Sequence, residues 1–62
     1  MRILDETIYE GTKRYIYAVG TSSEAKPTEN IATGSIYYEV NTSKAYMFNE
    51  TNNTWFEMGG GA

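Results

Sequence analysis

Residues 34–56 read GSIYYEVNTSKAYMFNETNNTWF. Three short runs rich in aromatic and β-branched side chains, at residues 35–40, 45–48 and 54–58, are separated by two clusters of Asn, Thr, Ser and Glu. Short runs that favour strands, bounded by residues that favour turns, are typical of a hairpin or meander. We therefore expect a three-stranded antiparallel meander over residues 35–58.

The register of the first turn stays open at the level of sequence. A strict four-residue loop over residues 41–44 pairs Tyr38 with Met47. A one-residue bulge in the same turn would instead place Tyr46 and Phe48 on the face of Tyr38. A shift of one residue turns every side chain to the opposite face. We expect the bulge, because it gathers the larger rings on one side.

Two further strands are expected upstream of the meander. The run KRYIYAVG at residues 13–20 alternates, with Tyr15 and Tyr17 on one face. A weaker strand pattern precedes it, and Gly11 and Thr12 form the turn between the two. The sequence thus predicts a hairpin over residues 3–20.

A polar segment at residues 21–33 joins the two parts. It contains the single proline, Pro27, which excludes a central strand and disfavours helix at the preceding residue. We expect a long loop that crosses over the sheet edge. The fold prediction is an all-β single domain over residues 1–58, followed by a flexible Gly-rich tail at residues 59–62.

Composition excludes several functions. The chain of 62 residues has no cysteine and no histidine, so disulfides, thiolate or imidazole metal sites and a histidine base are absent. Paired carboxylates remain, but so short a chain leaves little room for a cleft. We therefore expect no enzyme, no metal and no cofactor.

Charge and hydropathy also limit the partners. The net charge is −3 and the five basic residues are scattered, which argues against nucleic acid. No apolar run approaches the roughly 20 residues that span a bilayer, and the first ten residues lack the apolar region of a secretory signal.

A sheet this small cannot shield all its rings from water, since the core of a short chain is marginal. We expect an apolar face that another chain covers, with these candidates: Tyr15, Tyr17, Ile36, Tyr38, Tyr46, Phe48 and Trp55. An alternative is a carbohydrate site in which Trp55 and Tyr46 stack on a sugar beside Asn52 and Asn53. A tryptophan in the last strand of a small domain is more often a core anchor.

The run GSIYYEVNTSKAYMFNETNNTWFEM at residues 34–58 resembles a segment that recurs in bacteriophage and prophage virion proteins. There a Gly-led strand carries Tyr-Tyr, a turn like Asp-Thr-x-x-Lys follows, and then come alternating aromatics, a polar turn and a Trp. The residues at matching places are Gly34, Tyr37, Tyr38, Asn41, Thr42, Lys44, Tyr46, Phe48 and Trp55. Asn41 replaces the more usual Asp, and Ser43 stands where Gly is often found. The upstream run at residues 17–34 also looks like small prophage-encoded proteins of Gram-positive gut bacteria.

This resemblance implies a structural role in a phage particle, as a capsid decoration, head-fibre or tail-associated module. It implies a location in the virion after assembly in the bacterial cytoplasm. The implied partners are copies of the chain itself, with a trimer favoured, or a larger phage structural protein. Two other functions stay open: a receptor- or carbohydrate-binding module of a tail fibre or surface protein, and a small inhibitor of a host protein.

Overall fold

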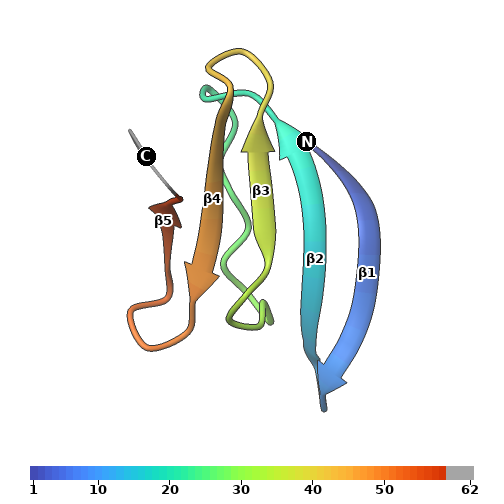
Figure 1. Ribbon diagram of the computed structural model, residues 1–62. Helices are drawn as coiled ribbons and strands as arrows, with labels where there is room; N and C mark the ends of the chain where they lie inside the picture. Colours follow the sequence, from blue (N-terminus) through green and yellow to red (C-terminus); the bar gives the residue numbers. More distant parts are fainter. Residues whose placement is uncertain (59–62) are drawn as a thin grey trace.

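The computed structural model describes residues 1–58, apart from the side chain of Tyr9. One sheet holds five strands in chain order, β1 Arg2–Glu10, β2 Lys13–Gly20, β3 Ile36–Glu39, β4 Lys44–Asn49 and β5 Thr54–Glu57 (Figure 1). The all-β class, the N-terminal hairpin and the three-stranded meander are confirmed. The tail predicted at residues 59–62 lies outside the described residues.

One junction in the sheet is parallel. β2 and β3 run in the same direction, whereas β1–β2, β3–β4 and β4–β5 are antiparallel. A parallel neighbour requires the chain to return to the starting end of the sheet. Residues 21–35, here called the crossover, make that return and pass behind β3 and β4 in Figure 1. The long loop was predicted, but it covers a face of the sheet and not its edge.

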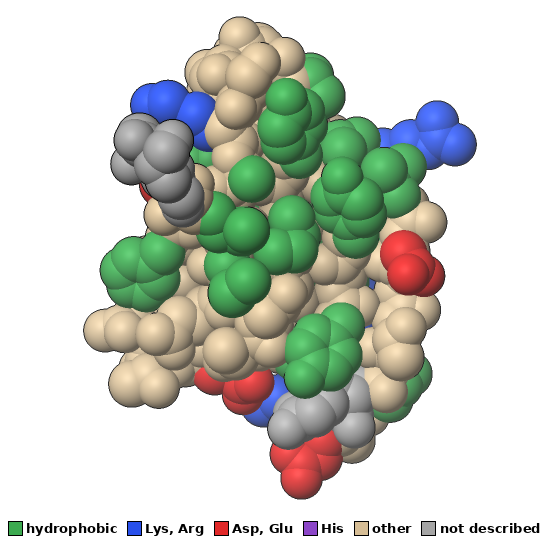
Figure 2. All heavy atoms as spheres, viewed as in Figure 1, with side chains coloured by type: hydrophobic (Ala, Val, Ile, Leu, Met, Phe, Trp, Pro, Cys, Tyr) green, Lys and Arg blue, Asp and Glu red, His purple; other side chains and the backbone are tan. Residues whose placement is uncertain are grey.

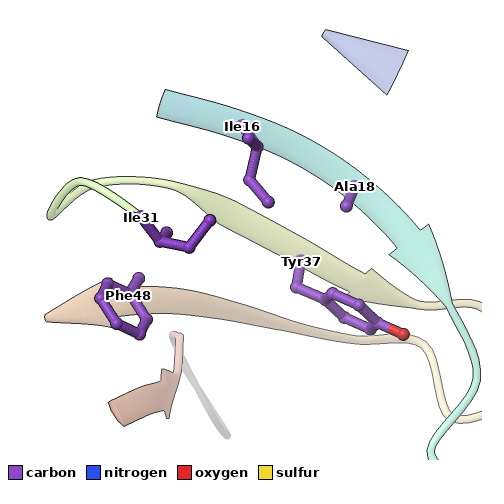
Figure 3. Packing of buried hydrophobic residues seen from close by; sticks show 5 residues of the cluster. All are labelled: Ile16, Ala18, Ile31, Tyr37 and Phe48. Carbon is purple, nitrogen blue, oxygen red and sulfur yellow. The ribbon is translucent and has the colours of Figure 1, made fainter. Parts of the chain in front are cut away.

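The core lies between the sheet and the crossover, on the side that we call the inner face. It contains five side chains that are at most 3% exposed: Ile16, Ala18, Ile31, Tyr37 and Phe48 (Figure 3). Ile31 comes from the crossover and fills the space over the strands. Trp55 packs edge-on against this cluster, with its ring centroid 5.1 Å from Phe48 and 5.9 Å from Tyr37.

The β3–β4 register shows that the expected bulge is wrong. Tyr37 lies opposite Tyr46, and Ile36 lies opposite Met47. The loop between the strands has four residues and ends at Ser43, which adopts a φ of 60° and donates its N–H to the Glu39 carbonyl at 2.8 Å. Tyr46 and Phe48 do share one side, but it is the inner side of Tyr37, which the crossover covers, and not the side of Tyr38.

Candidate interaction surface

The opposite side of the sheet, here called the outer face, is apolar and lies open. Its apolar members across β2–β5 are Tyr15, Tyr17, Val19, Ile36, Tyr38, Ala45, Met47 and Phe56. Three polar residues, Lys13, Asn49 and Thr54, lie on the same side at one end of the sheet. The strand register aligns four of the apolar members in one row from β2 to β5: Tyr17, Ile36, Met47 and Phe56. Figure 2 views this side, and hydrophobic side chains gather over the middle of the sheet.

Across β2–β5, few charged side chains lie on the outer face, whereas β1 places Arg2, Asp5 and Glu10 on that side. Beyond Lys13 and Arg14 at the start of β2, the charged residues of β2–β5 are Glu39, Lys44 and Glu57. The register places all three on the inner face, since Glu39 pairs with Lys44 and Glu57 lies opposite Tyr46. A half-covered antiparallel sheet normally turns its polar residues to water. The four strands β2–β5 do the reverse, so their open side is their less charged side.

A buried ion pair fastens the crossover to one end of the inner face. Lys26 Nζ lies 2.6 Å from Glu39 Oε2, and the two side chains are only 18% and 5% exposed. Thr42 Oγ1 donates to the other Glu39 oxygen at 2.7 Å. The hydrogen bond from Lys26, and then that from Thr42, hold the pKa of Glu39 below its usual value. Lys26 Nζ also lies 4.4 Å from the Tyr46 ring centroid and 4.9 Å from that of Tyr37.

A second set of polar contacts fastens the other end of the crossover. Glu50 accepts the backbone N–H of Thr33 at 2.9 Å, and Thr33 Oγ1 accepts the N–H of Glu50 at 2.8 Å. Lys13 Nζ lies 2.9 Å from the same carboxylate. The Thr33 N–H and then Lys13 lower the pKa of Glu50. Because the crossover is held at both ends, it closes the inner face and leaves the outer face exposed.

The interface candidates from the sequence divide between the two faces. Four lie on the outer face: Tyr15, Tyr17, Ile36 and Tyr38. Three lie on the inner face: Tyr46, Phe48 and Trp55. Two exposed outer-face residues were missed by sequence reasoning, Met47 at 39% and Phe56 at 49% exposed. The correct register would have revealed both, because it places them in a row with Ile36.

The four carbohydrate candidates have different environments. The Trp55 indole N–H donates to the Pro27 carbonyl at 2.7 Å, and its ring packs on the core. Tyr46 lies beneath the Lys26 ammonium. Asn52 and Asn53 are exposed in the turn between β4 and β5. Trp55 therefore anchors the crossover to the sheet, which leaves its N–H committed within the chain.

The described part of the chain offers no other candidate site. Over residues 1–58 no pocket opens, and no group of three or more His, Cys, Asp or Glu side chains is placed to hold a metal ion. The same residues contain no helix long and apolar enough to cross a membrane. Within these residues, the outer face is the candidate functional surface.

The chain was compared with protein families, curated proteins and solved structures. No protein family, no curated protein and no solved structure matches the chain.

Proposed function

We propose that the chain is a non-enzymatic structural module that packs through its outer face against another protein surface in an assembled particle. The observation that carries this proposal is the exposure of Tyr17 and Phe56, 47% and 49%, on a face whose one charged residue across β2–β5 is Lys13 at its rim. Contiguous apolar patches of several hundred Å² on a small protein mark contact surfaces.

The shape and composition of the outer face favour a protein partner. The described surface has no pocket to enclose a small ligand, and a sheet presents a flat area. Tyr, Phe and Met, which supply much of the face, are enriched at the centres of protein interfaces, where charged residues are depleted. A sheet of this kind is suited to pack against another sheet at about 10 Å.

The resemblance of residues 34–58 to virion segments supports a phage or prophage particle as the setting. In such a particle the partner is a copy of this chain or a larger structural protein. The outer face is then buried by assembly, and the charged inner face with its crossover faces outward or toward solvent channels.

The test is site-specific photo-cross-linking in particles from a host that carries the gene. Phe56→p-benzoylphenylalanine places a cross-linker on the outer face, and Leu4→p-benzoylphenylalanine is the matched control on β1, where Leu4 is 51% exposed. We expect the chain in purified particles at a fixed ratio, with cross-links to a structural protein from position 56 and few from position 4. Absence of the chain from the particles, or equal cross-linking at both positions, would contradict the proposal.

A further inference from the structure

We infer that the partner of the outer face is the outer face of a second copy, so that two five-stranded sheets form a two-fold sandwich. This inference depends on the proposed function in one respect, namely that the outer face is a protein interface. It goes further by naming the occupant and the number of copies.

The exposed area fits a weak dimer. Four outer-face side chains are between 39% and 49% exposed: Tyr15, Tyr17, Met47 and Phe56. Since side chains of this size present about 200 Å² when free, these four and their half-buried neighbours leave roughly 500 Å² uncovered. Two copies face to face would bury roughly 1,000 Å², which is the lower limit for a specific interface. Association is therefore expected to depend on concentration.

The distribution of charge fits a like partner. The chain carries a net charge of −3, so two copies repel each other at long range. The outer face of β2–β5 nevertheless holds no charge beyond Lys13 at its rim, so two such faces meet without burying an ion. A basic partner would need carboxylates, and the nearest outer-facing one is Asp5 on β1, opposite Tyr17. The face is suited to an apolar surface such as its own.

The row across the sheet is complementary to itself. A two-fold axis that lies between the sheets and runs along the strands reverses the strand order. The row then packs on the same row of the partner copy, which runs in the opposite order; its residues are Tyr17, Ile36, Met47 and Phe56. Tyr17 lies over Phe56 of the partner copy, and Ile36 lies over Met47. Rings meet rings and aliphatic groups meet aliphatic groups, at the aligned angle usual for packed sheets.

The same geometry favours two copies over the three that the virion resemblance implies. A self-complementary face closes with a single partner, whereas a ring of three needs two different complementary patches on each chain. β1 does expose Leu4 and Ile8. However, the ion pair of Glu6 with Arg14, at 2.9 Å, interrupts that surface, since Arg14 lies opposite Ile8. Among the described strands, the outer face of β2–β5 is the broad apolar surface, and Lys13 at its rim is its one charged residue.

Sedimentation of the purified chain tests the inference. Between about 10 μM and about 1 mM, the mass should rise from 7.0 kDa toward twice that value. Phe56→Lys should raise the dimer dissociation constant by more than about tenfold, because it replaces the ring that meets Tyr17 of the partner copy with a cation. Leu4→Lys, the matched control on β1, should leave the constant unchanged. Added salt should strengthen the dimer, because it screens the repulsion between like net charges.

Circular dichroism decides whether each variant is folded. If Phe56→Lys unfolds, Met47→Lys on the same row takes its place, and the Phe56→p-benzoylphenylalanine chain must yield a cross-linked homodimer in solution. A wild-type chain that stays at 7.0 kDa near 1 mM overturns the inference, as does a Leu4→Lys variant that dissociates as readily as Phe56→Lys.

The two proposals fail in different ways. A chain that is monomeric in solution but cross-links from position 56 to another particle protein overturns the inference and keeps the proposed function. A chain that dimerises through position 56 but is absent from particles keeps the inference and overturns the particle setting.

Discussion

Ile31→Ala tests whether the crossover forms the second layer of the core. Ile31 is 1% exposed and packs with Ile16, Tyr37 and Phe48. The change removes about three carbon groups at about 0.8 kcal/mol each. A residual cavity of about 40 Å³ would cost about 1 kcal/mol more, for a total of about 3 kcal/mol. A chain of 62 residues has a total stability of about 3–9 kcal/mol, so this loss is a third of it or more.

Thermal unfolding at about 1 μM, where the chain is expected to be monomeric, measures the effect. Fluorescence of the single tryptophan reports on the crossover directly, because the Trp55 indole N–H donates to the Pro27 carbonyl. The midpoint should fall by about 12–24 °C. The matched control is Ile8→Ala, at a side chain that is 63% exposed, and it should cost less than about 0.5 kcal/mol. Equal shifts for the two variants would refute a core that includes the crossover.

Three further predictions concern the inner face. Gly20→Ala should destabilise the chain by about 1–3 kcal/mol, because a Cβ there would lie 2.0 Å from Tyr37 Oη; thermal unfolding measures the loss. Tyr37→Phe should keep or raise the melting temperature, since within residues 1–58 its buried hydroxyl has no hydrogen-bond partner, and a clear loss would show that one exists. The folded-state pKa of Glu39 is lowered, so its contribution is present above the ordinary value of 4.5 and is lost as the pH falls through the lower folded value. The melting temperature of Glu39→Gln should therefore fall less steeply below pH 4.5 than that of the wild type. An equal fall in both chains would contradict the ion pair with Lys26.

Local sequence signals were sufficient for the strands and for most of the turns. Tyr15 and Tyr17 alternate with small or aliphatic residues, which placed the β2 faces correctly. The Gly11–Thr12 turn follows from glycine, which adopts a φ of 58° there. These features depend on neighbours in the chain, so a single sequence is enough to predict them.

The parallel junction and the β3–β4 register depend on distant contacts, which explains why they were not predicted. The crossover contains few apolar residues, and the burial of Ile31 depends on Ile16 and Phe48 from two other strands. The register depends on whether Ser43 adopts a left-handed φ, which serine tolerates but does not require. The error at that turn hid Met47 and Phe56, and with them half of the row on the outer face.

The sorting of charges between the faces explains which face the chain covers with its own loop. The crossover is polar, so it can close a sheet only where the strands offer partners for its polar groups. The inner face does so through Glu39, which binds Lys26. The outer face of β2–β5 offers rings and aliphatic groups. A polar loop packed on them would bury its own hydrogen-bonding groups without partners. An apolar layer can cover such a face without burying unpaired hydrogen-bonding groups. The outer face of a second copy is such a layer.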